Sequence, residues 1–157
     1  MGINEAVCVI QNSDITGNIV FKYIKKDKCM EIIVNLQNVP SGYHGFHIHE
    51  SGDLREGCKS LCKHFNPNNM DHGGLKSTNR HLGDLGNIKP DLFGNVNKTV
   101  YEPNLKFYGK CSIIGRSIVI HDKKDDLGKG NNKESLITGN AGNRIACGVI
   151  GISKNCC

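Results

Sequence analysis

Residues 45–50 read Gly-Phe-His-Ile-His-Glu, and this segment combines the pattern of a strand with two candidate metal ligands. Residues that are two apart on a strand point to the same face, so His47 and His49 project together. Two imidazoles on one face can bind one metal ion, although a polar outer strand face has the same pattern. The segment therefore predicts a strand and leaves its chemistry open.

Further segments of the same kind lie on both sides of this strand, and each is short, rich in β-branched residues and bounded by turn residues. They span residues 3–10, 18–23, 31–39, 95–100, 116–121 and 145–152, and residues 82–88 are a weaker eighth candidate. No segment repeats apolar residues at a helical period over a dozen positions, so we expect very little helix. The pattern predicts an all-β fold, an antiparallel sandwich or barrel.

Length and composition narrow the class of protein. A chain of 157 residues is one domain's worth, so we expect a single domain over residues 1–157. No stretch approaches the roughly 18 apolar residues of a membrane span, and the N-terminal segment lacks a secretory signal, so we expect a cytoplasmic protein. The net charge of +5 comes with scattered lysines, no Trp and 6% aromatic residues, which argues against a nucleic-acid partner.

Two long polar loops, residues 50–80 and 122–144, interrupt the strands, and long ordered loops in a small domain are usually functional. The first loop and its exit carry three imidazoles and a carboxylate, at His64, His72, His81 and Asp84. This set suits the tetrahedral preference of zinc, or consists of solvated loop histidines. His121 lies at the end of a predicted strand, and by itself this position does not indicate a metal ligand.

Longer motifs connect these residues in one order along the chain. They are residues 45–50 (GFHIHE), 64–67 (HFNP), 72–74 (HGG), 80–87 (RHLGDLGN), 118–121 (IVIH), 125–130 (DDLGKG) and 138–151 (TGNAGNRIACGVIG). With these motifs the sequence resembles the copper–zinc superoxide dismutases over nearly its whole length. The resemblance implies an eight-stranded antiparallel Greek-key β-barrel with two long functional loops.

The resemblance also implies two ligand sets that share one residue. Copper is expected on His47, His49, His64 and His121, and zinc on His64, His72, His81 and Asp84. His64 then bridges the two cofactors as an imidazolate. Asp125 is expected to brace a ligand of each metal, since such partners fix ring orientation and raise ligand basicity.

The implied reaction converts two superoxide anions into oxygen and hydrogen peroxide. Copper does the redox work, because zinc has no accessible redox couple. His64 is the expected proton donor, and Arg144 is the expected anion-binding residue, with a charge that cannot be lost. Thr138 is expected on the other side of the substrate channel. The lysines of the second loop, Lys123, Lys124, Lys129 and Lys133, are either attracting charges or ordinary surface lysines.

The chain has 8 cysteines. The resemblance implies a disulfide between Cys58 and Cys147, and Cys8 and Cys111 match positions that are often free. We assign no role to Cys29, Cys62, Cys156 or Cys157. Cys62 is a departure so close to His64 that it could compete for metal or for disulfide pairing. Lys63 and Leu75 stand where family members usually have prolines. This bears on the stiffness of the first long loop, residues 50–80, which is called the metal loop below.

The resemblance further implies a homodimer, formed through the Gly52-Asp53 loop, the Ile114-Gly115 turn and Ile152. A copper chaperone is a candidate partner for copper loading, and the compartment would be the host cytoplasm if the protein is viral. Two other functions stay open. One is a copper-chaperone-like metal-transfer protein, for which the Cys156-Cys157 tail is faintly suggestive, and the other is a redox-inactive zinc protein.

Overall fold

A computed structural model describes residues 2–11 and 13–156, so Cys157 lies outside the described residues. All eight predicted strands are present, with ends shifted by one or two residues. They are β1 (Glu5–Ile10), β2 (Thr16–Ile24), β3 (Cys29–Gln37), β4 (His44–His49), β5 (Asp84–Ile88), β6 (Val96–Glu102), β7 (Ser117–His121) and β8 (Arg144–Ile152). The weak candidate at residues 82–88 is therefore a genuine strand, and the all-β prediction is confirmed.

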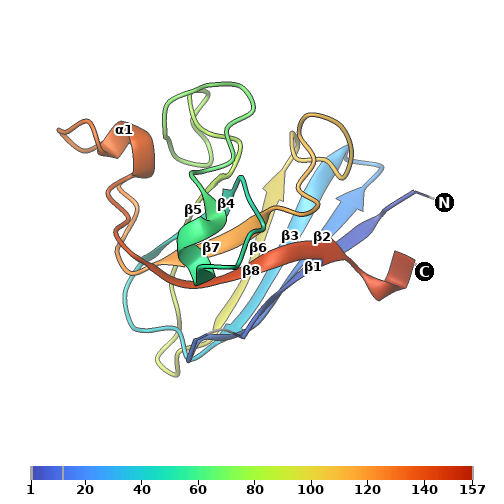
Figure 1. The fold of residues 1–157 in the computed structure, drawn as a ribbon, viewed down its shortest axis with the longest axis horizontal. Helices are drawn as coiled ribbons and strands as arrows, with labels where there is room; N and C mark the ends of the chain where they lie inside the picture. The colour runs from blue at the N-terminus through green and yellow to red at the C-terminus, as the bar shows by residue number, and fades with distance from the viewer. Residues whose placement is uncertain (1, 12, 157) are drawn as a thin grey trace.

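The strands form one antiparallel sheet in the order β5-β4-β7-β8-β1-β2-β3-β6. The sheet curls into a nearly closed barrel (Figure 1). The connections from β3 to β4 and from β6 to β7 join strands that are not neighbours, which is the Greek-key arrangement. The two edge strands, β5 and β6, leave a seam where the barrel does not close by strand pairing.

One half of the barrel follows the simple alternation of a half-buried strand. In β3, Met30, Ile32 and Val34 are fully buried, whereas the residues between them are more exposed. In β2, Ile19 and Phe21 point into the same core. Alternating apolar residues thus give this half one dry face and one wet face.

The other half is buried on both faces. Every residue of β4 and β7 is buried. Phe46 and Ile118 belong to the main core, whereas His47 and His121 lie among the histidines of a separate cluster. The two long loops cover this half, and they contain only short helices, η1 (Gly57–Leu61) and α1 (Ser135–Thr138) (Figure 1).

Within the described residues, no helix is long and apolar enough to cross a membrane.

Candidate metal centre

The structure gathers the predicted ligands into two buried clusters that share His64. In each cluster the candidate ligand atoms all lie within 4.8 Å of one another, in the sets His47, His49, His64, His121 and His64, His72, His81, Asp84. Strands β4 and β7 supply three residues of the first set, and the first loop and the start of β5 supply the second set. These sets are the two that the sequence implies.

The second cluster has the dimensions of a tetrahedral site. Asp84 Oδ1 lies 2.9 Å from His64 Nδ1, 3.1 Å from His72 Nδ1 and 3.2 Å from His81 Nδ1. His64 Nδ1 and His81 Nδ1 are 3.3 Å apart. Ligands about 2.0–2.1 Å from a central zinc ion would be about 3.3–3.4 Å from one another. The donor set therefore fits zinc in both chemistry and spacing.

Buried ring nitrogens without hydrogen-bond partners mark both clusters. In the described part of the chain they are His47 Nδ1, His49 Nε2, His64 Nε2, His72 Nδ1 and His121 Nε2. Buried polar atoms in proteins are nearly always paired, so such a group needs an explanation. Four of the five belong to the first cluster, and together they form a nitrogen-rich donor set that suits copper.

Hydrogen bonds on the opposite ring nitrogens fix which atoms are free to bind metal. His49 Nδ1 donates to the carbonyl of Cys62 at 2.9 Å, and His121 Nδ1 donates to that of Gly142 at 3.1 Å. A ring nitrogen that donates carries the proton, so the other nitrogen of the neutral ring presents a lone pair. The unpartnered Nε2 atoms of His49 and His121 therefore present lone pairs that can bind a metal ion.

Asp125 connects the two clusters from behind. Its carboxylate accepts from His47 Nε2 at 2.7 Å and from His72 Nε2 at 2.8 Å. Asn87 holds Asp125 in place, since its side chain donates to the Asp125 carbonyl at 2.9 Å and accepts from the Asp125 amide at 2.8 Å. Gly139 leaves room for this contact, because a Cβ atom there would lie 2.1 Å from Asp125 Oδ1.

The protonation states suit metal binding. Burial, together with the neighbouring His64, lowers the pKa of His47 to about 3, and burial lowers that of His121 to about 4. These rings are neutral at pH 7, as metal ligands must be. For His72, burial acts in the opposite direction, but the Asp125 carboxylate, which accepts from Nε2, and the nearby Asp84 carboxylate outweigh it and raise its pKa to about 9. A dication at this site would take the place of that proton.

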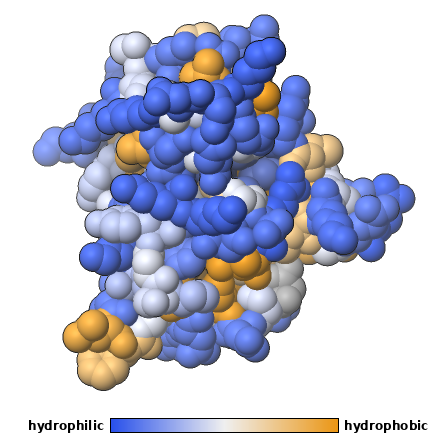
Figure 2. All heavy atoms as spheres, turned by 90° about the vertical axis from the view of Figure 1, so that its left-hand side faces the viewer, coloured by the Kyte–Doolittle hydropathy of each residue, from blue (hydrophilic) through white to orange (hydrophobic). Residues whose placement is uncertain are grey.

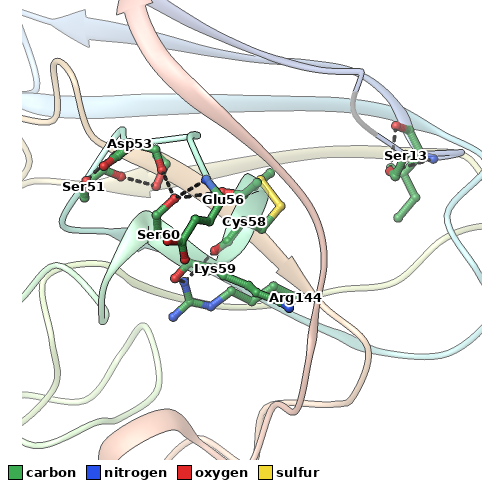
Figure 3. The surroundings of a disulfide bond; sticks show 12 residues. Ser13, Ser51, Asp53, Glu56, Cys58, Lys59, Ser60 and Arg144 are labelled. Carbon is green, nitrogen blue, oxygen red and sulfur yellow. Dashed lines mark hydrogen bonds between the residues drawn. A yellow bond between two sulfur atoms is a disulfide. The ribbon is translucent and has the colours of Figure 1, made fainter.

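A cleft of about 540 Å³ leads from the surface to the first cluster, lined by His49, His64 and His121. Arg144 lies in its wall, close to Cys58 (Figure 3). Its guanidinium donates to the carbonyl of Cys58 at 2.7 Å and to that of Cys62. Thr138 also lines the cleft and donates to Glu134 Oε1 at 2.7 Å. The side of the molecule that carries α1 is mainly hydrophilic (Figure 2).

Comparisons with known proteins agree with this geometry. The family model described as copper/zinc superoxide dismutase (SODC) matches residues 15–150. The chain belongs to this family. A superoxide dismutase [Cu-Zn] of Paramecium bursaria Chlorella virus 1 is 50% identical over 85% of this chain and 72% of its own. An extracellular superoxide dismutase [Cu-Zn] of Drosophila melanogaster is 46% identical over 90% of this chain and 78% of its own.

A crystal structure of the clock protein EA4 has a TM-score of 0.93 and 41% identity, and the match covers 98% of this chain and 97% of that one. Fold, family and clusters together make this copper–zinc superoxide dismutase an oxidoreductase, with copper and zinc as its cofactors. No observation favours the metal-transfer alternative or the redox-inactive zinc protein.

The cysteines of this superoxide dismutase divide into one disulfide and several thiols. Cys58 and Cys147 are joined, the pair that the resemblance implies, and the bond ties η1 to β8. Cys62 is an exposed free thiol beside the cleft and belongs to neither metal cluster. Its backbone, at φ 63° and ψ −152°, has a conformation that is nearly exclusive to glycine.

The second-loop lysines lie in different surroundings in the structure. Lys123 lines the cleft, but Lys124 lies over the ring of Tyr43, and Lys129 lines a different cavity. The first loop supplies two further cations to the cleft, Lys59 and Lys63. Sequence reasoning missed these, since only the path of the loop brings them to the cleft.

Sequence reasoning also missed two residues that hold the clusters. Asn87 is one, and its place in the motif of residues 80–87 was the available signal. The other is Arg80, which donates to the carbonyl of His81 at 3.0 Å and forms an ion pair with the buried Glu102. His44 lies outside both clusters and bonds to the carbonyls of His121 and Pro40.

Proposed function

We propose that this superoxide dismutase holds copper on His47, His49, His64 and His121, and zinc on His64, His72, His81 and Asp84. The observation that carries the proposal is the set of buried, unpartnered ring nitrogens, all of which belong to these two sets. Copper supplies the redox couple for the two half-reactions, and zinc is structural. Overall, two superoxide anions and two protons become oxygen and hydrogen peroxide.

His64 is proposed to supply a proton. Its Nδ1 faces the zinc set, whereas its Nε2 is unpartnered, faces the copper set and borders the cleft. Nε2 is therefore the atom that can hold a proton within reach of a bound anion.

Arg144 is proposed to bind and orient superoxide. Two carbonyls fix its guanidinium in the cleft wall, so little side-chain freedom is lost when an anion binds. Thr138 is proposed to form the facing wall. Asp125 is proposed as a positioning residue that acts through His47 and His72 rather than on the substrate.

Metal content and superoxide decay, measured on the same samples, test this assignment. His121→Ala is expected to lose copper and activity while it keeps zinc. His44→Asn is the matched control, because His44 is a buried histidine with two carbonyl partners and no place in either cluster. It should keep both metals. Full copper loading of His121→Ala would overturn the assignment.

We also propose the predicted homodimer. The three predicted segments meet on one surface. A Cβ atom on Gly52 would lie 2.3 Å from the carbonyl of Gly115, whose own amide bonds Ile150, and Ile152 is 52% exposed. A partner subunit on this surface would cover the exposed Ile152. Ile152→Lys should convert a dimer to a monomer in sedimentation, and a monomeric wild type would refute the proposal.

A cytoplasmic site of action is a further proposal, with the host cytoplasm as the compartment if the protein is viral. Four described cysteines are free thiols, at Cys8, Cys29, Cys62 and Cys111, which suits a reducing compartment. The extracellular relative makes secretion the alternative, and cell fractionation separates the two.

A copper chaperone is the proposed partner for copper loading. Expression in cells without such a chaperone should then yield protein that lacks copper.

A further inference from the structure

A second cavity lies at the seam between the edge strands of the barrel. It has a volume of about 430 Å³ and is lined by the end of the metal loop, by β5 and β6, and by the second loop. The lining residues are Gly74, Leu75, Lys76, Ser77, Leu85, Gly86, Asn87, Lys98, Leu127 and Lys129. It shares no lining residue with the active-site cleft.

This seam cavity combines three cations with an apolar wall. Lys76, Lys98 and Lys129 line it, and no acidic residue does. None of the three takes part in an ion pair among the described residues, in which the lysine pairs involve Lys22 and Lys63. Three ammonium groups around one small volume repel one another, and a multivalent anion would relieve this repulsion.

Lys98 is the best positioned of the three cations. It projects from β6 across the seam, and its Nζ donates to the carbonyl of Asn87 on β5 at 2.7 Å. One of its three donors is thereby used and its position is fixed, while two donors are left for a ligand. The side chain is otherwise exposed, so these donors are accessible to a ligand from solution.

We propose that the seam cavity binds a phosphate monoester with an apolar body. Leu75 and Leu127, which are partly exposed, supply the surface for the body, and the three lysines supply the charge for a phosphate dianion. Lysine binds phosphate as a point charge and needs no single geometry. Most small-molecule sites combine an apolar lining with a few placed polar groups in this way.

An occupant would touch the residues that hold Asp125. Asn87 lines the cavity and clamps the Asp125 backbone, and Leu127, also in the lining, donates its amide to Asp125 Oδ1 at 2.7 Å. A bound phosphate monoester should therefore restrain the second loop. Binding itself does not depend on the proposed metal assignment, so a failure of either proposal can be recognised separately.

Calorimetric titration of the metal-loaded protein with hexyl phosphate, inorganic phosphate and hexanol is the test. Hexyl phosphate should bind saturably and at least about tenfold more tightly than either fragment, because only it has both halves. Lys98→Met should weaken this binding about tenfold. Lys133→Met is the matched control, an exposed lysine of the second loop outside the cavity lining, and it should bind as the wild type does.

Hydrogen exchange gives a readout independent of activity. Hexyl phosphate should slow exchange of amides in residues 74–77 and 127–129 in the wild type but not in Lys98→Met. The proposal is overturned if hexyl phosphate does not bind saturably, if inorganic phosphate binds equally well, or if Lys133→Met loses affinity as Lys98→Met does. The last result would show general attraction by a basic protein.

Discussion

In both β3 and β4, successive side chains alternate between the core and the outer face of the sheet, but the outer faces of the two strands differ in burial. In β3 the inward positions, such as Ile32 and Val34, are fully buried, and the outward positions are more exposed. In β4 the inward positions Phe46 and Ile48 are equally buried, but the outward positions are buried as well. The difference is that two loops cover the outer face of β4 and leave that of β3 open.

This comparison shows where the site gets its chemistry. Burying a polar group is unfavourable unless the group is paired. The outer face of β4 carries His47 and His49, each with one ring nitrogen bonded and the other unpartnered. In the covered half of the barrel, bound metal ions would therefore pair the buried polar atoms. The open half is stabilised by apolar packing alone.

The strongest test of this difference is to remove the residue that both clusters share. His64→Ala should lose both metals and bring activity to background, a loss at least as large as the about 10²–10⁴-fold that a general acid contributes. Metal analysis with a superoxide decay assay measures both effects. Zinc loading equal to that of the wild type would contradict a bridging role for His64.

The disulfide should be the next largest effect, and it acts on the covered half. Cys58 and Cys147 are 89 residues apart in sequence, so the chain-entropy account gives about 4–5 kcal/mol of stabilisation. Cys58→Ser should lower the melting temperature of the metal-loaded protein by about 10–20 °C. Calorimetry measures this, and η1 should become the first segment to exchange its amide hydrogens.

Phe21→Ala is the control from the open half. Phe21 is fully buried in the core, and its truncation should cost about 3–5 kcal/mol. The loss of stability is thus similar, but metal content in the folded state should stay at wild-type values. If Phe21→Ala lost metal as readily as Cys58→Ser, metal binding would depend on both halves of the barrel alike, contrary to this comparison.

The sequence predicts the open half better than the covered half. Alternating residues such as Ile32 and Val34 depend only on their own strand, so their burial follows from the pattern. The spacing of His47 and His49 places them on one face for the same reason. The positions of Lys59 and Lys63 at the cleft depend on how a long loop returns to the barrel, and no local pattern records that path.

Arg144 sits at the boundary between the halves, as the first residue of β8. Arg144→Ala should lower the rate constant for superoxide by about tenfold, equivalent to about 1.4 kcal/mol, with both metals retained. Arg144→Lys should restore only part of the rate, because an ammonium group cannot donate to both carbonyls and to an anion in one plane. A fully metallated Arg144→Ala with unchanged activity would remove this role.

The smallest effect should come from the lysines, and here the structure divides a group that is uniform in sequence. Lys63 and Lys123 line the cleft, whereas Lys124 and Lys129 do not. A unit charge about 10 Å from an anion in water contributes about 0.4 kcal/mol before screening, and exposed charges are screened beyond about 8 Å at physiological salt. Neutralising the cleft pair by Lys63→Met and Lys123→Met should therefore slow superoxide decay by about two- to threefold at low salt, and the deficit should shrink as salt is added.

The double variant Lys124→Met and Lys129→Met is the control. It removes the same net charge and should lower the rate of superoxide decay less at every ionic strength. Equal losses in the two double variants would mean that net charge, not the placement of cations at the cleft, attracts the substrate.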